Sequence, residues 1–198
     1  GRGNDLEYVT MNKSIKELFN ISMALNNEST YDRENNKIIG GNITDRALLN
    51  YIKDFKVDYK IIKQEVFDSK KKYMYTKIKY NNHNYNLVKG AYEVIIRMCN
   101  SYYDKEGIKH TIIDKKILDK RIKEISASKI RILALAINED RETINNMTLL
   151  GFVLLFDEVR ENVYEGIDLV KNAHIQTVMI TGDNKETAVA IARDIGLI

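Results

Sequence analysis

The sequence predicts an α+β fold, in which an antiparallel sheet flanked by helices is followed by the beginning of a parallel α/β unit. Three observations support this prediction. Segments rich in β-branched and aromatic residues are separated by turn residues, as in hairpins. Segments with apolar residues three and four positions apart, typical of helices, alternate with them. After residue 156 the order changes to helix, strand and helix, which is typical of βαβ units.

The first predicted domain, residues 1–156, contains the helices and strands of the antiparallel part. Each helix has an apolar face, and Thr44 is suited to cap the second one. The cluster Asn81–Asn84 predicts a hairpin turn. In chain order, the expected elements are helices at 15–25 and 44–55, strands at 61–67, 73–80 and 85–88, helices at 92–99 and 114–128, and strands at 131–137 and 149–156.

The second predicted domain, residues 157–198, carries Thr181-Gly182-Asp183 between a strand at 175–180 and a helix that ends near Gly196. Open α/β sheets bind ligands at the carboxyl ends of their strands. A hydroxyl, free backbone N–H groups and a carboxylate suit phosphate and Mg²⁺. Because one or two strands cannot bury a doubly wound sheet, we expect this domain to be partial.

Composition narrows the possible functions. The formal net charge of +3, from 31 basic and 28 acidic residues, is too small to indicate binding of nucleic acid. The only cysteine, Cys99, excludes an internal disulfide and is expected on a helix face as an inert core residue. The histidines are scattered without metal-ligand spacing. No apolar stretch approaches the roughly 20 residues that cross a bilayer.

Three segments of the first domain suit a phosphorylated ligand. Lys89-Gly90-Ala91 is expected in a strand-to-helix turn, where lysine and the helix N-terminus favour anions and glycine permits close approach of a ligand. Phe67 beside Lys72 offers an aromatic face with a positive charge, and base stacking contributes about 1–3 kcal/mol. Arg131 begins an inner strand and can bind phosphate. Taken singly, each segment has a simpler interpretation as a solvated turn, a core aromatic or a structural ion pair.

The order and spacing of the motifs make the functional interpretation stronger. In chain order they are Thr44-Asp45-x-Ala47-Leu48, Phe67-x-Ser69-x-x-Lys72-x-Met74, Lys89-Gly90-Ala91-x-Glu93, Arg131-x-Leu133-Ala134-Leu135-Ala136, Asp157-x-x-Arg160 and Met179-Ile180-Thr181-Gly182-Asp183-Asn184-Lys185-x-Thr187-Ala188. This succession resembles the nucleotide-binding domain and adjoining phosphorylation-domain segment of P-type cation-transporting ATPases, particularly the calcium-pump-like type II branch. The resemblance covers almost the whole chain.

The resemblance implies that the chain binds ATP and presents it for phosphoryl transfer to an aspartate outside this chain. Phe67 would stack on adenine, Asp45 would lie near the adenine amino group, and Arg131 would bridge to the phosphates. The whole implied pocket is lined by Asp45, Phe67, Lys72, Met74, Lys89, Gly90, Ala91, Arg131 and Leu133. Thr181, Gly182 and Asp183, supported by Asp157, would hold the transferred phosphoryl group.

The resemblance also implies a haloacid-dehalogenase-like fold for the second segment and Mg²⁺ as cofactor of the parent protein. The expected partners are the phosphorylation and actuator domains and the transmembrane helices of a membrane pump. The parent would lie in the cell membrane with this part on its cytoplasmic face, and the fragment itself would be soluble and monomeric. Because the Asp-Lys-Thr-Gly-Thr motif of the phosphorylated aspartate is not in the sequence, the fragment is expected to bind nucleotide without turning it over.

Some positions depart from the family's usual pattern. Tyr92 and Glu158 stand where the family has proline, and Asp45 replaces the usual glutamate, which is one methylene longer. Two alternative functions remain open at this point. One is a soluble phosphatase fragment of the haloacid-dehalogenase kind, because Thr181-Gly182-Asp183 fits that superfamily too. The other is a non-catalytic interaction domain whose nucleotide site has decayed.

Overall fold

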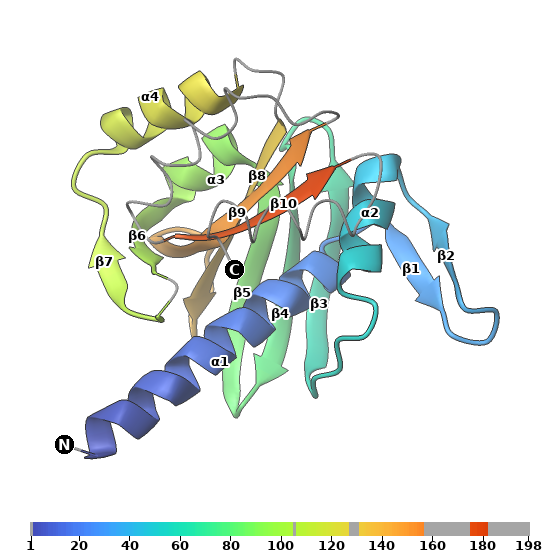
Figure 1. Ribbon diagram of the computed structural model, residues 1–198, viewed down its shortest axis with the longest axis horizontal. Helices are drawn as coiled ribbons and strands as arrows, with labels where there is room; N and C mark the ends of the chain where they lie inside the picture. Colours follow the sequence, from blue (N-terminus) through green and yellow to red (C-terminus); the bar gives the residue numbers. More distant parts are fainter. Residues whose placement is uncertain (1, 105, 127–130, 157–174, 182–198) are drawn as a thin grey trace.

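The computed structural model describes residues 2–104, 106–126, 131–156 and 175–181. Within these ranges it shows a large, mostly antiparallel sheet flanked by helices (Figure 1). In chain order the elements are α1 (Arg2–Leu25), β1 (Ser29–Asp32), β2 (Lys37–Gly40), α2 (Ile43–Tyr51), β3 (Lys60–Asp68), β4 (Tyr73–Tyr80), β5 (His83–Ala91), α3 (Tyr92–Met98), β6 (Cys99–Tyr103), β7 (Lys109–Thr111), α4 (Lys115–Ser126), β8 (Arg131–Glu139), β9 (Met147–Phe156) and β10 (Gln176–Thr181). The predicted antiparallel sheet with flanking helices is confirmed.

The main sheet has the strand order β3-β4-β5-β8-β9-β6-β7, and β10 pairs with β9. The strands from β3 to β9 are antiparallel to their neighbours along this order. The edge of β9 that faces away from β8 has two parallel partners, β6 near its start and β10 along the rest. Strands β5 and β8 pair with each other in the middle of the sheet, although they are distant in sequence.

Two apolar cores cover the two faces of the sheet, and β8 shows why. Its side chains alternate between the faces: Ala134 and Ala136 pack with α3 and α4, whereas Leu135 and Ile137 pack with α1 and α2. The small alanines leave room for α3, which lies directly against β8 and contributes the buried Ile95. Helix α1 crosses the other face diagonally (Figure 1).

Several local predictions were wrong. Asn42, not Thr44, caps α2, because its side chain accepts a hydrogen bond from the Asp45 N–H at 2.8 Å. Strand β5 continues through Lys89, Gly90 and Ala91, so this motif is the end of a strand and not a separate turn. Cys99 begins β6 and is not helical, although it is buried as expected, and burial raises the pKa of its thiol to about 12.

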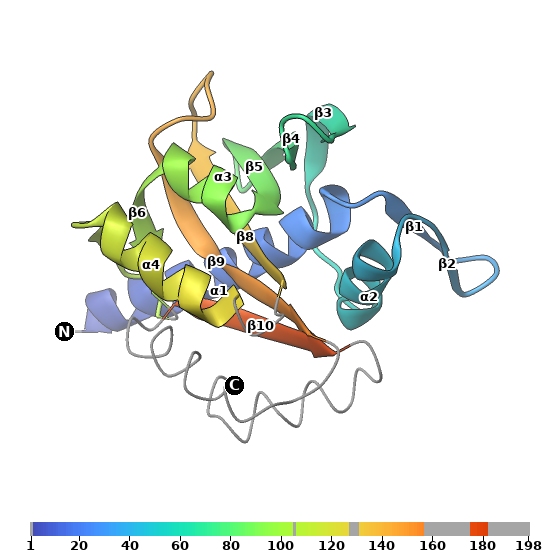
Figure 2. The same cartoon turned by 90° about the horizontal axis from the view of Figure 1, so that it is seen from above.

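The short strands β1, β2, β6 and β7 were not predicted. The hairpin β1–β2 projects from the main body in both views (Figure 1; Figure 2), and its two strands pair only with each other among the described residues. All four strands are only three to five residues long, so each is too short to show a clear apolar alternation. Most of the predicted second domain, residues 157–174 and 182–198, lies outside the described residues, and the boundary at 157 stays a prediction.

A cluster of three polar side chains joins the start of β5 to the end of β8, and its members are His83, Glu139 and Asp140. His83 Nδ1 lies 2.9 Å from an Asp140 carboxylate oxygen and 3.0 Å from one of Glu139. The hydrogen bond to Asp140, followed by the charge of Glu139, raises the pKa of His83 above 6.5. Because the folded state holds this proton more tightly, the stabilisation is fully present below pH 6.5 and is lost as pH rises through the raised pKa.

The substitution His83→Gln is therefore expected to lower stability at pH 6 and to have little effect at pH 9. Urea unfolding midpoints of the wild-type and variant chains, measured across this range, test the expectation. A difference in unfolding midpoint between the two chains that stays constant with pH would show that the charge of the His83 imidazolium does not stabilise the fold.

Candidate functional site

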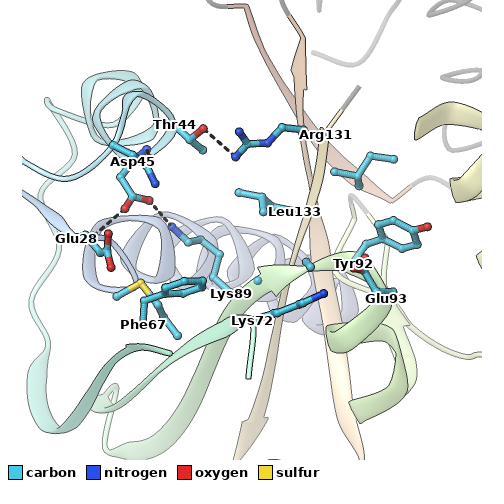
Figure 3. A pocket seen from close by; sticks show the side chains of 15 residues that line it. Glu28, Thr44, Asp45, Phe67, Lys72, Lys89, Tyr92, Glu93, Arg131 and Leu133 are labelled. Carbon is cyan, nitrogen blue, oxygen red and sulfur yellow. Dashed lines mark hydrogen bonds and ion pairs between the residues drawn. The ribbon is translucent and has the colours of Figure 1, made fainter. Parts of the chain in front are cut away.

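A pocket of about 450 Å³ lies where the end of β5, the start of β8 and the first turn of α2 meet the β3–β4 turn (Figure 3). It is lined by Glu28, Asn42, Thr44, Asp45, Phe67, Lys72, Met74, Lys89, Gly90, Ala91, Tyr92, Glu93, Arg131, Ile132 and Leu133. The residues come from segments spread over more than a hundred positions of the chain, so only the fold brings them together.

The structure places all the pocket residues that the resemblance implied along this one pocket. They are Asp45, Phe67, Lys72, Met74, Lys89, Gly90, Ala91, Arg131 and Leu133. Thr181 is the last residue of β10 and does not line the pocket as described. Asp157, Gly182 and Asp183 lie outside the described residues.

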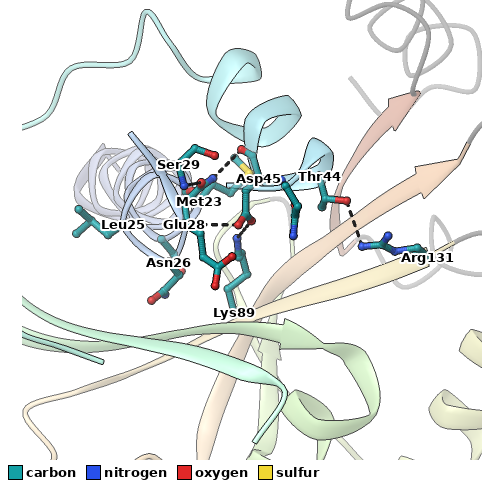
Figure 4. Close-up of polar contacts among 12 residues, drawn as sticks. Met23, Leu25, Asn26, Glu28, Ser29, Thr44, Asp45, Lys89 and Arg131 are labelled. Atoms are coloured by element: carbon teal, nitrogen blue, oxygen red, sulfur yellow. Dashed lines mark hydrogen bonds and ion pairs between the residues drawn. The ribbon is translucent and has the colours of Figure 1, made fainter. Parts of the chain in front are cut away.

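The floor of the pocket contains a buried ion pair. Lys89 Nζ lies 3.4 Å from Asp45 Oδ1, and the two residues are only 4% and 7% exposed. Burial lowers the pKa of Lys89, while the negative charge of Asp45 opposes this shift. The other oxygen of Asp45 accepts a hydrogen bond from the Glu28 N–H at 3.1 Å (Figure 4). Asp45 therefore anchors both the lysine and the chain that enters β1.

Gly90 is required by packing against the β3–β4 turn. A Cβ atom at Gly90 would lie 2.4 Å from the carbonyl oxygen of Lys72 and 2.7 Å from the Cβ of Tyr73. The same Lys72 carbonyl accepts a hydrogen bond from the Ala91 N–H at 3.2 Å. The sequence interpretation, in which glycine admits a ligand, misses this contact. The absent side chain lets the turn approach and sets Lys72 at the rim of the pocket.

The pocket has an apolar middle section. Phe67, near the end of β3, is 44% exposed, whereas Met74 is buried and Leu133 is half-buried on the strands behind it. An accessible aromatic ring with aliphatic neighbours is a surface on which a flat ring system can stack. The exposure of Phe67 also contradicts the simpler interpretation of this residue as part of the core.

Arg131 and Lys72 supply exposed positive charge at the other end of the pocket. The guanidinium of Arg131 donates a hydrogen bond to Thr44 Oγ1 at 3.1 Å, which joins β8 to α2. A guanidinium has several donors and can bind an anion while keeping this contact. Thr44 thus positions Arg131 and does not cap the helix.

Glu28 is the lining residue of most interest that the sequence motifs did not indicate. It follows α1 in a connection to β1 and is exposed, so neither periodicity nor a motif marks it. The other lining residues that were not predicted are Asn42, Thr44, Tyr92, Glu93 and Ile132, each of which lies within a motif or within two positions of one. Proximity in sequence to the motifs that begin at Thr44, Lys89 and Arg131 was the available signal for them.

Comparison with known families gives one match over most of the chain. A family model described as P-type ATPase, cytoplasmic domain N, matches residues 14–162. This range includes all the residues that line the pocket. Among the described residues, no helix combines the length and apolar character needed to cross a membrane.

Several curated proteins are similar in sequence. Calcium-transporting ATPase 1 of Bacillus cereus is 31% identical over 98% of this chain, which corresponds to 23% of that protein. Plasma membrane calcium-transporting ATPase 4 of Bos taurus is 32% identical over 80% of this chain and 15% of its own length. Calcium-transporting ATPase 1 of Schizosaccharomyces pombe is 30% identical over 74% of this chain and 16% of its own length. The chain thus spans less than a quarter of the length of these relatives.

Proposed function

This chain belongs to the P-type ATPase family, of which it contains cytoplasmic domain N. We propose that its pocket is the ATP-binding site of a cation pump. The observation that carries the proposal is the convergence of Phe67, Lys72 and Lys89 on one pocket. The similar proteins named above are calcium-transporting ATPases, which supports calcium as the ion moved by the parent protein.

The shape and charge of the pocket support a definite orientation of ATP. The purine lies on the accessible face of Phe67, against Met74 and Leu133. The triphosphate extends towards Arg131 and Lys72, the exposed cations of the pocket. Charge-assisted hydrogen bonds to phosphate are among the stronger ones in proteins. Lys89, which is buried beside Asp45, closes the base end of the pocket.

In the parent pump, the bound ATP is presented to an aspartate outside this chain, which takes the γ-phosphoryl group. Thr181, Gly182 and Asp183 hold that group across the cleft, with Asp157 in support, on a haloacid-dehalogenase-like segment that adjoins this domain. The remaining partners are the rest of the phosphorylation domain, the actuator domain and the transmembrane helices. The pocket works on the cytoplasmic side of the membrane, and the fragment by itself is a soluble monomer.

Mg²⁺ accompanies ATP in this proposal. The ion usually binds through one or two carboxylates together with substrate phosphates, and it keeps several waters. The Asp45 carboxylate, which is engaged by Lys89, does not fit this role. When bound, Mg²⁺ would be held by the triphosphate and by groups outside this pocket, and it would neutralise phosphate charge.

Titration with ATP tests the proposed function. The wild-type chain is expected to bind with a dissociation constant on the order of 0.1–1 mM, about −4 to −5.5 kcal/mol, and ATP should shift the amide signals of Phe67, Lys89 and Arg131. Phe67→Ala should weaken binding about tenfold, because stacking of a base contributes about 1–3 kcal/mol.

Lys70→Ala is the control, because Lys70 is exposed in the β3–β4 turn, three positions from Phe67, and does not line the pocket. Its affinity for ATP should equal that of the wild-type chain. Equal affinities of Phe67→Ala and the wild-type chain would overturn the assignment of the base site.

A further inference from the structure

The cluster of His83, Glu139 and Asp140 lies outside the pocket described above. His83 begins β5 and Glu139 ends β8, whereas the pocket is lined by the other ends of these strands, at Lys89 and Arg131. Because β5 and β8 pair in antiparallel orientation, the cluster and the pocket lie at opposite ends of the same strand pair. The cluster is therefore a separate feature of the surface, which the proposed function does not use.

The three side chains bring one potential ligand atom each to the same place. Nδ1 of His83 lies 2.9 Å from an oxygen of Asp140 and 3.0 Å from an oxygen of Glu139, and the three atoms all lie within 4.8 Å of one another. Zinc bonds of about 2.0–2.2 Å in a tetrahedral arrangement place neighbouring ligand atoms roughly 3.3–3.6 Å apart. Small side-chain rotations would therefore let the three atoms surround one ion.

The second carboxylate distinguishes this cluster from an ordinary ion pair. A histidine needs only one carboxylate, as His110 shows with Asp104 at 2.7 Å. At His83, oxygens of both Glu139 and Asp140 face the same ring nitrogen. One proton on that nitrogen must serve two oxygens, whereas a metal ion would bind the nitrogen and both oxygens.

Backbone contacts hold the carboxylates in place. The other oxygen of Asp140 accepts a hydrogen bond from the Asn84 N–H at 2.9 Å, and the Asp140 N–H donates to the Asn84 carbonyl at 2.7 Å. Glu139 lies in the ladder between β5 and β8. Ligand carboxylates in metal sites are commonly oriented by such hydrogen bonds. The sheet thus positions these groups before any ion binds.

The cluster is accessible to an ion, and its charge favours a cation. The three side chains are 48% to 55% exposed. With a neutral imidazole, the two carboxylates contribute two negative charges. Lys77 is near enough to act on the charge of Asp140, but its ammonium group also lies 3.9 Å from Glu142. Negative charge therefore remains in excess around the cluster.

We propose that His83, Glu139 and Asp140 form a binding site for a divalent transition-metal ion such as Zn²⁺. Three protein ligands leave one position of a tetrahedral ion for water. The imidazole selects ions of this class, because Ca²⁺ and Mg²⁺ bind mainly oxygen ligands. The bound ion joins the start of β5 to the end of β8. The inference is independent of ATP binding, since none of its three residues lines the pocket.

Calorimetric titration of the metal-free, nucleotide-free 198-residue chain with zinc chloride tests the proposal. The measurement is made at pH 8, because a protonated imidazole nitrogen cannot bind a metal. Zn²⁺ should shift the amide signals of His83, Asn84 and Asp140. His83→Gln and Glu139→Gln should each weaken binding at least about tenfold, since loss of a group that merely orients a ligand already costs 10–100-fold.

His110→Gln is the matched control. His110 also contacts a carboxylate, that of Asp104, but it belongs to no group of three such ligands among the described residues. This variant should bind Zn²⁺ as tightly as the wild-type chain. Wild-type affinity in His83→Gln would overturn the proposed site, as would a wild-type chain that does not bind Zn²⁺. Binding of Ca²⁺ at the same amide signals, as tight as that of Zn²⁺, would overturn the role of the imidazole.

Discussion

Replacing Lys89 with methionine is expected to lower the free energy of unfolding by about 3–5 kcal/mol, because breaking a buried ion pair leaves one charge uncompensated. The charge left unpaired is the carboxylate of Asp45, whose side chain is 10% exposed. Methionine keeps much of the lysine volume, so the change isolates charge from packing. Urea unfolding at pH 7 measures the loss directly.

A double variant distinguishes the loss of the ion pair from any other effect of the substitution. Asp45→Asn removes the charge and retains a side-chain oxygen that can accept the Glu28 N–H. Lys89→Met combined with Asp45→Asn should therefore recover more than half of the stability that Lys89→Met loses. If the double variant is less stable than the single one, the buried pair is not the source of the effect.

Gly90→Ala is expected to destabilise the chain by about 3 kcal/mol, because overpacking of an interior typically costs 1–3 kcal/mol and sometimes more. The new methyl group would meet the Lys72 carbonyl oxygen at 2.4 Å. This atom belongs to the backbone and cannot rotate away, so the β3–β4 turn must move. Since Lys72 also lines the pocket, affinity for ATP should fall as well.

Gly40→Ala is the appropriate comparison. Gly40 has a positive φ of 74°, and a Cβ there would meet its nearest neighbour at 3.4 Å, which is ordinary contact. This variant should lower the free energy of unfolding by only about 1–2 kcal/mol, the cost of placing alanine in the left-handed conformation. The amide signals of Lys72 and Tyr73 should stay unchanged. Equal shifts of those signals in both variants would contradict the packing argument for Gly90.

The elements with clear periodicity were predictable from sequence. Strand β4 was predicted at residues 73–80, the bounds that the structure gives, and β8 and β9 differ from prediction by two residues at one end. These strands are largely buried, so their apolar residues are a direct consequence of the fold. The four-residue strands β1 and β2 carry no such pattern, because among the described residues they pair only with each other.

Local capping was less predictable. Both Asn42 and Thr44 are residue types that cap helices, and they stand two positions apart. Asn42 is the cap, and the Thr44 hydroxyl instead accepts a hydrogen bond from Arg131, on a strand 87 positions away in sequence. No local rule includes such a distant partner.

The sequence alone determined the class of the fold and the family, because six ordered motifs and the periodicity of the buried strands are properties of the chain itself. Only the tertiary structure decided which contacts the individual pocket residues make. Lys89 lies beside Asp45, 44 positions away in sequence, Gly90 packs against the backbone of Lys72, and Asp45 accepts a hydrogen bond from the Glu28 N–H. The physical reason is that burial and the choice of a charge partner depend on which distant segments the fold brings into contact, and spacing along the chain does not contain that information.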